Sequence, residues 1–292
     1  PLPGLDLAEA PDGTGDARVQ AYCFRLCLTD HPENRAPFPR PEGYDEADYE
    51  LLFRLLETGY RRPWMTFSRM PNRKTDTNNH GPFSTDVIGL SHAWPTASYE
   101  ERDRLFEAHV RHQQGLVWTL ANHERVPEEV RAQFADWGLA RDEWQATGNW
   151  PPRLYVREAR RLVGELTMTE DHCFGREVAP HPIARAAYTI DSHNVRRRIS
   201  YAGGAPETGW VKNEGDVQVG GFEPFGIGYG AIVPRRAECT KLLVPVALSA
   251  THVAFGSIRM EPVFFVLGEA AGQAALATIA RDIDVQDVHA DR

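Results

Sequence analysis

Several features that would assign this protein to a class are missing from its sequence. Only four cysteines occur among 292 residues, and they show neither CxxC spacing nor the density of a disulfide framework. We therefore expect reduced thiols and a cytoplasmic location. No signal peptide is recognisable, although the sequence starts with Pro1 rather than Met, which leaves that question open.

A dinucleotide-binding loop is also missing. No predicted strand is followed by GxGxxG and a helix, the arrangement that cradles a pyrophosphate. The glycine-rich run at residues 220–230, GGFEPFGIGYG, is not followed by a helical pattern, so we exclude it as this loop.

Positive charge and long apolar runs are scarce as well. The net charge of −9 disfavours nucleic acid and anionic membranes, so we expect neither as a partner. No run of about 18 apolar residues is free of small or charged interruptions, and we expect no membrane span. With 42% hydrophobic and 25% charged residues, the composition is typical of a soluble globular protein with a substantial core.

Metal-ligand spacing is not recognisable either. His109 and His112 stand three apart on a predicted helix, without the acidic partner of an HExxH motif. His172, Cys173 and His181 are ligand types without ligand spacing. We expect no metal site.

The clearest pattern that is present lies at residues 239–280. An apolar run at 242–248 predicts a strand buried on both faces. A turn of small and polar residues follows at 249–257, and then a helix to about Ala280 that admits Pro262 in its first turn. Strand, turn and tightly packed helix are how α/β folds present a helix N-terminus to an anionic or electron-rich ligand.

The rest of the chain alternates predicted helices and strands. A helix capped by Asp45, a long helix opened by the capping box Ser98–Glu101 and a helix beginning at Pro127 are expected. Further predictions are strands at 18–28, 188–195, 216–219 and 227–233, a polar loop at 69–83 and a helix at 154–164. The fold class is α/β (α+β mixed), with a substrate domain at 1–234, a helical insertion at about 98–165 and a closing strand–turn–helix at 235–292.

Five further segments carry a family resemblance. Together with residues 239–280, they resemble in order a family of FAD-dependent oxidoreductases, some members of which are labelled xanthan lyases; the segments are 20–38, 71–89, 154–172, 190–198 and 211–221. The resemblance implies FAD as the cofactor and a flavoprotein fold whose FAD-binding domain is completed by residues 235–292. In that family the dinucleotide loop lies in an N-terminal region, so we expect this chain to be a C-terminal portion that binds FAD weakly alone.

The resemblance places the flavin at the turn and the start of the helix after it. A helix N-terminus there would face the negative charge near N1 and O2 of a reduced flavin. Gly256 and Ser257 would let backbone approach the ring, and Arg259 would add a fixed charge. The alternative is a structural corner in which Arg259 pairs with Glu261. The predicted cofactor-binding residues are Ser249, Thr251, His252, Gly256, Ser257, Arg259, Met260 and Glu261.

Two histidines are candidates for a catalytic base. Asp191 and His193 lie two apart in a predicted strand and so share a face, and a carboxylate beside an imidazole raises its pKa and orients it. The alternative is a hydrogen-bonded pair at a polar strand edge. His252 competes with His193, and we place it ahead because it lies closer to the predicted flavin.

Substrate contacts are expected from the polar loop. Many fixed donors and acceptors in six residues suit a sugar-like substrate, although such a loop can also cap its own turns. The substrate-binding candidates are Lys74, Asp76, Asn78, Asn79 and Tyr229.

These features together predict an enzyme that transfers hydride from a hydroxylated small molecule, such as a carbohydrate, to FAD. A polysaccharide lyase or carbohydrate-binding protein is one alternative, and a non-catalytic piece that needs the missing region is another. Gly230 stands where the family pattern usually has Arg, so a contact made by that Arg would be lost here. The oligomeric state stays open.

Overall fold

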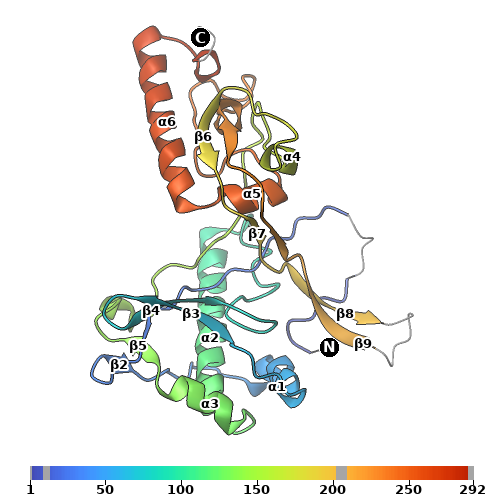
Figure 1. The fold of residues 1–292 in the computed structure, drawn as a ribbon, viewed down its shortest axis with the longest axis vertical. Helices are drawn as coiled ribbons and strands as arrows, with labels where there is room; N and C mark the ends of the chain where they lie inside the picture. The colour runs from blue at the N-terminus through green and yellow to red at the C-terminus, as the bar shows by residue number, and fades with distance from the viewer. Residues whose placement is uncertain (1, 9–13, 202–208, 289–292) are drawn as a thin grey trace. The chain divides into compact units, whose positions relative to one another are not determined.

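The computed structural model describes residues 2–8, 14–201 and 209–288, and the chain forms two compact units that alternate along its length (Figure 1). Unit 1 comprises Pro1–Arg157 and Asn194–Glu214; unit 2 comprises Glu158–His193 and Gly215–Arg292. Each unit has its own hydrophobic core. Mixed helices and strands confirm the predicted fold class, whereas the sequential division at residue 234 stays a prediction.

Unit 1 is built on a five-stranded antiparallel sheet with the strand order β2-β5-β1-β4-β3. Its strands are β1 Leu28–Thr29, β2 Arg35–Ala36, β3 Met65–Met70, β4 Lys74–Asn79 and β5 Gly138–Ala140, and a separate hairpin pairs β8 Arg196–Tyr201 with β9 Gly209–Glu214. Its helices are α1 Glu50–Glu57, α2 Tyr99–Asn122 and α3 Glu128–Ala135, with 3₁₀ turns at Glu46–Tyr49 and Gln145–Thr147.

Local sequence accounts for the helices of unit 1. The Ser98 hydroxyl accepts from the Glu101 amide, and the Glu101 carboxylate accepts from the Ser98 amide, so the predicted capping box opens α2. Asp45 caps the 3₁₀ turn that leads into α1. Apolar side chains on these helices then share one core with strands β1, β3 and β5.

Unit 2 holds shorter strands and the two helices of the chain end. Its elements are α4 Glu170–Cys173, β6 Pro182–Ala186, β7 Ile190–Ser192, β10 Val217–Val219, β11 Phe225–Gly228, α5 His252–Ile258 and α6 Glu261–Arg281, with 3₁₀ turns at Tyr229–Ile232 and Val285–Asp287. β7 pairs with β10 and β6 with β11, both antiparallel. α5 lies on β7 and α6 on β6.

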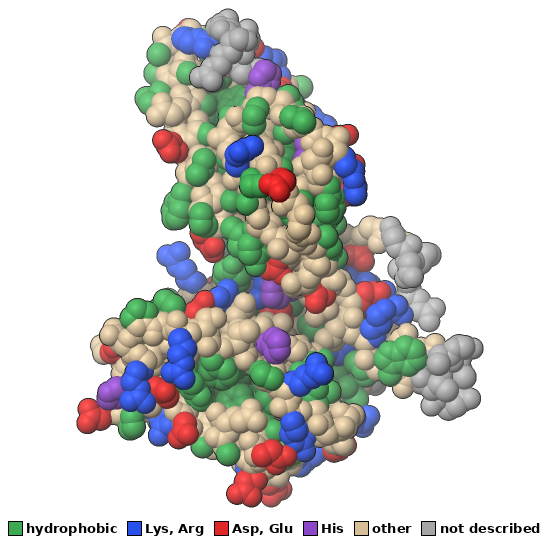
Figure 2. Space-filling view, viewed as in Figure 1, with side chains coloured by type: hydrophobic (Ala, Val, Ile, Leu, Met, Phe, Trp, Pro, Cys, Tyr) green, Lys and Arg blue, Asp and Glu red, His purple; other side chains and the backbone are tan. Residues whose placement is uncertain are grey.

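Helix α6 begins as predicted, with Pro262 in its first turn. A stripe of residues at helical spacing is buried: Val263, Leu267, Ala271, Ala274 and Thr278. Large apolar side chains are exposed elsewhere on the helix, among them Phe265, Leu276 and Ile279, and Figure 2 shows hydrophobic side chains along it. By length and composition alone, α6 is the one helix of the described chain that could cross a membrane.

Several expectations about local structure are wrong, among them the strand at 18–28, of which only Leu28 belongs to a strand, β1. Residues 242–248 form no strand, because Pro245 removes a ladder donor and Leu242 and Val246 are exposed. Residues 154–164 form no helix; Tyr155 and Gly164 instead make isolated β-bridges with Cys23 and Pro234.

Two further wrong expectations concern stretches predicted to be irregular. Most of the polar loop at 69–83 is the β3–β4 hairpin, whose reversal uses positive φ at Asn72 (63°) and Arg73 (57°). The second half of the expected turn at 249–257 is helix α5, and Thr251 caps it by accepting from the Ala254 amide.

The packing of unit 2 can be tested by a substitution at Gly164. A Cβ on this residue would lie 2.7 Å from the Gly230 carbonyl oxygen and 2.8 Å from that of Val233. Gly164→Ala should therefore lower the free energy of unfolding by about 1–3 kcal/mol, measured by urea denaturation. Gly268→Ala on α6 is the control, because its Cβ would meet nothing within 4 Å. It should raise stability by about 0.5–1 kcal/mol; equal effects of the two changes would contradict this packing.

A second prediction concerns His109, which is buried on α2 with Nδ1 2.7 Å from the Leu105 carbonyl oxygen. Burial lowers the pKa of His109 to about 4, whereas an unfolded histidine titrates near 6.5. Between these values only the unfolded chain takes up the proton. Stability should therefore be complete above about pH 6.5 and fall as pH drops toward about 4.

The measurement is urea unfolding at intervals of pH for the unchanged chain and for His109→Gln. The slope of stability against pH should fall in the variant by about one proton, or about 1.4 kcal/mol per pH unit. Identical slopes would show that His109 titrates normally in the folded state.

Candidate functional site

In unit 2, β7 and α5 bring a carboxylate, an imidazole and a hydroxyl into one chain of contacts. His252 Nδ1 lies 2.9 Å from Glu158 Oε2, and its Nε2 lies 2.8 Å from Ser192 Oγ. The Glu158 side chain is only 2% exposed and also accepts from Arg161 Nη1 at 2.9 Å. The His252 side chain is 34% exposed, so it is the member of the group that solvent and ligands can reach.

The hydrogen bonds define where protons sit. An ionised carboxylate only accepts, so Glu158 holds a proton on Nδ1 of His252. Neutral His252 then accepts from the Ser192 hydroxyl at Nε2. When Nε2 is protonated, it donates to Ser192 Oγ instead, and that hydroxyl can turn to the Gly215 carbonyl oxygen, 3.1 Å away. Both protonation states are satisfied without moving the chain.

The order carboxylate, histidine and serine resembles a hydrolase triad. Ser192, however, is fully buried on β7, and a serine nucleophile must reach its substrate. The accessible member of the group is the imidazole, which lies between the buried carboxylate and the buried hydroxyl. The arrangement therefore suits proton transfer at His252 rather than acylation of Ser192.

The predicted pair Asp191 and His193 is looser. His193 Nε2 lies 3.8 Å from Asp191 Oδ1, beyond hydrogen-bond distance. The principal partner of Asp191 is Arg259, whose Nη2 donates to Oδ2 at 2.9 Å and to the Asp191 carbonyl oxygen at 3.0 Å. Gln218 also donates to Asp191 Oδ1 at 2.8 Å. A catalytic role for His193 stays a prediction.

Four of the eight predicted cofactor residues are buried within unit 2. Gly256 packs on β7, where a Cβ would come within 3.2 Å of the Asp191 backbone, and the buried Ser257 hydroxyl donates to the Tyr188 carbonyl oxygen. Ser249 is buried, with Oγ 3.0 Å from Thr167 Oγ1. Arg259 pairs with Asp191, not with Glu261.

The other four are reachable: Thr251, His252 and Met260 are half-buried and Glu261 is exposed. They supply hydroxyl, imidazole, thioether and carboxylate groups at the starts of α5 and α6, where a ligand can reach them.

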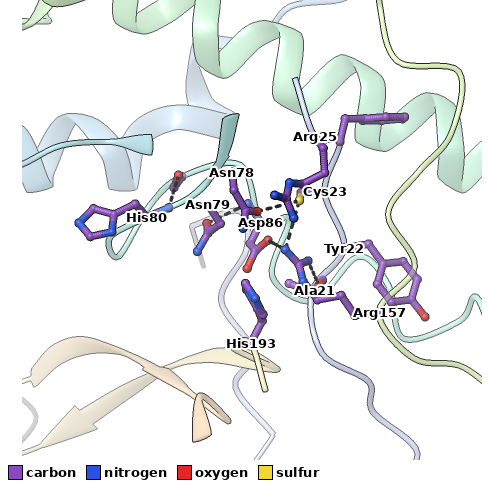
Figure 3. Close-up of polar contacts among 12 residues, drawn as sticks. Ala21, Tyr22, Cys23, Arg25, Asn78, Asn79, His80, Asp86, Arg157 and His193 are labelled. Atoms are coloured by element: carbon purple, nitrogen blue, oxygen red, sulfur yellow. Dashed lines mark hydrogen bonds and ion pairs between the residues drawn. The ribbon is translucent and has the colours of Figure 1, made fainter. Parts of the chain in front are cut away.

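Three of the predicted substrate residues lie on β4 in unit 1, close to a buried polar cluster (Figure 3). Asp76 pairs with Arg25, and Asn78 Oδ1 accepts from the Cys23 thiol at 3.8 Å. Asn79 Oδ1 accepts from the Asp86 amide at 3.1 Å. These side chains are partly exposed, so they are open to a ligand while they hold the cluster in place.

The centre of this cluster is Arg157. Its guanidinium is fully buried, with Nη2 2.9 Å from Asp86 Oδ1 and 3.2 Å from Cys23 Sγ, and Nη1 donates to the Ala21 carbonyl oxygen. Burial raises the pKa of the Cys23 thiol to about 11 despite this positive charge. Cys23 is therefore a protonated packing group at neutral pH rather than a nucleophile.

The other two predicted substrate residues, Lys74 and Tyr229, lie away from this cluster, although Lys74 is also on β4. Lys74, at the start of β4, is paired with Asp142 at 2.8 Å and with Glu143. Tyr229 is buried in unit 2, where its hydroxyl donates to the Val285 carbonyl oxygen at 2.8 Å, and burial raises its pKa to about 12. Substrate contacts by these residues stay predictions.

Sequence reasoning missed Glu158, Ser192, Asp86 and Arg157. Glu158 and Arg157 fall in the segment predicted to be a helix, and charged residues are common on the exposed face of a helix. Their partners are 94 and 71 residues away along the chain, counted to His252 and Asp86 (252 − 158 and 157 − 86). The available signal was the density of positive charge in this segment, which holds four arginines at 153, 157, 160 and 161. A buried member of such a group is stabilised by an acidic partner.

The Asp86–Arg157 pair gives a direct test. Asp86→Asn leaves a buried guanidinium without its countercharge and should lower the free energy of unfolding by about 3–5 kcal/mol in urea denaturation. Asp76→Asn is the matched control, because it neutralises a partly exposed ion pair with Arg25 and should cost less than about 1 kcal/mol. Equal losses would show that Arg157 does not depend on Asp86.

Comparison with known proteins identifies the family. The family model described as FAD dependent oxidoreductase matches residues 5–292. None of the curated proteins and none of the solved structures compared with the chain matches it. The family implies oxidoreductase chemistry, FAD as cofactor and a fold of the FAD-binding type. The chain belongs to the FAD-dependent oxidoreductase family.

Proposed function

We propose that this chain oxidises a hydroxylated small molecule, with His252 as the base that takes up the hydroxyl proton. The contact chain Glu158–His252–Ser192 carries the proposal. In such an oxidation the substrate hydroxyl loses its proton and the carbon that bears it loses a hydride, which leaves a carbonyl group. Acceptance of that hydride is the chemistry that FAD supplies in the family.

The buried carboxylate prepares His252 for this task. Glu158 fixes the imidazole with Nδ1 protonated, so the lone pair is at Nε2, and it stabilises the imidazolium that forms. Ser192 occupies Nε2 in the resting state. Its hydroxyl has the Gly215 carbonyl oxygen as a second acceptor, so Nε2 can be released to a substrate without leaving Ser192 unpaired.

We infer a polyhydroxylated substrate, such as a carbohydrate, from the polar side chains of β4. Asp76, Asn78 and Asn79 combine carboxylate and amide groups on partly exposed positions, which suits an array of hydroxyls. This inference concerns unit 1 alone and is independent of the role of His252.

The test is anaerobic stopped-flow reduction of the FAD-loaded enzyme by a panel of alcohols and sugars, followed across pH. His252→Gln should slow reduction by about 10²–10⁴-fold and remove the acidic limb of the pH profile, because no base remains to be protonated. Glu158→Gln should also slow reduction, but by less, because the imidazolium that forms loses its countercharge.

His193→Gln is the control and should retain both the rate of flavin reduction and the acidic limb of the pH profile. If the His193 variant loses the acidic limb while the His252 variant keeps it, the base is His193. An unaltered profile in both variants would reject a histidine base.

A further inference from the structure

Unit 1 contains a cavity of about 650 Å³, a size within the range of about 300–1,000 Å³ that is usual for small-molecule sites. Its wall comes from five parts of unit 1: the segment before β1, the 3₁₀ turn Glu46–Tyr49, the loop after β4, helix α2 and strand β8. The basic side chains in the wall are Arg18, His92, Arg111, His112, Arg196 and Arg197, and the acidic ones are Asp6, Asp48 and Asp86.

Most of these charges are already matched. Arg18 pairs with Asp6 at 3.3 Å and with Asp16 at 3.2 Å. Arg196 pairs with Glu214, and Asp86 with Arg157. These pairs occupy two of the three acidic side chains in the wall, Asp6 and Asp86.

Two arginines in the wall, Arg111 and Arg197, have no carboxylate at ion-pair distance among the described residues. Arg111 is exposed, so the buried exception is Arg197. It is 6% exposed, yet no carboxylate of the described chain lies within ion-pair distance of it. Its Nε donates to Asn213 Oδ1 at 2.9 Å and its Nη2 to the Pro82 carbonyl oxygen at 3.1 Å, whereas Nη1 has no hydrogen-bond partner among the described residues. Burial lowers the pKa of Arg197 to about 10, which reflects a charge held without a counterion.

The surroundings of Arg197 are partly apolar. The guanidinium lies over the Phe83 ring, 5.0 Å from its centroid, and Val87 and Ile88 line the same cavity. His112 stands beside Phe83, with ring centroids 6.0 Å apart, and burial together with the charge of Arg197 lowers its pKa to about 4. At neutral pH His112 is therefore an uncharged donor and acceptor next to a cation.

We propose that this cavity binds a small organic carboxylate, with the carboxylate on Arg197 and the apolar body against Phe83, Val87 and Ile88. A carboxylate supplies the countercharge that the chain withholds from Arg197 and an acceptor for Nη1. The apolar wall favours an organic anion over a small inorganic one. This proposal goes beyond the oxidation proposed above and does not depend on it.

Calorimetric titration of the whole chain with benzoate, and with the uncharged benzamide of almost the same shape, tests the proposal without any substitution. Benzoate should bind saturably and benzamide at least about tenfold more weakly, because only benzoate makes a charge-assisted bond to a buried guanidinium. In NMR titrations, bound benzoate should raise the pKa of His112, since the anion offsets the charge of Arg197.

Two variants locate the site. Arg197→Met should weaken benzoate at least about tenfold, whereas Arg198→Met should bind it normally, because Arg198 pairs with Glu214 and does not line the cavity. Equal binding of benzoate and benzamide, or unaltered binding in Arg197→Met, would overturn the proposal. If sulfate binds as tightly as benzoate, the claim that the cavity selects an organic anion is wrong.

Discussion

A guanidinium taken out of water is stabilised by a countercharge inside the protein, and a buried pair of this kind organises each unit. In unit 1, Arg157 is fully buried against Asp86 and ties the segment at Ala21 and Cys23 to the loop after β4. In unit 2, Arg259 from the end of α5 is buried against Asp191 and holds that helix on β7. Each pair connects segments far apart in sequence, so each fixes a region that local preference leaves undefined.

The same kind of pair explains how His252 is placed. Because Arg259 fastens α5 to β7, Ser192 at the end of β7 meets the first residue of α5. Glu158 completes the contact from the other side of the imidazole and is itself held by Arg161, which also donates to the Ala250 carbonyl oxygen at 2.9 Å. Asp191 therefore serves the candidate base indirectly, by anchoring the helix that carries it, and not as the direct partner of His193.

Features set by neighbouring residues were predictable from the sequence, and features set by distant ones were not. The capping box of Ser98 and Glu101 and the first-turn Pro262 mark α2 and α6 correctly, because their determinants lie within one turn of helix. The stretch at 154–164 has a helical composition, but burial of Arg157 and of Glu158 against partners elsewhere draws it into extended chain. For the site, the sequence could nominate His252 but could not supply Glu158 or Ser192, which approach it only in the folded chain.

The alternation of the two units along the chain has a consequence for synthesis. The core of unit 1 is specified by residues up to about 154, but its β8–β9 hairpin is completed only at Glu214. Unit 2 receives α6 only after Arg281 has been added, so the residues that pack on its buried stripe have no partner until then. At about 5–20 residues per second, the 67 residues from 215 to 281 (281 − 214) take roughly 3–13 s, during which the earlier part of unit 2 lacks this helix.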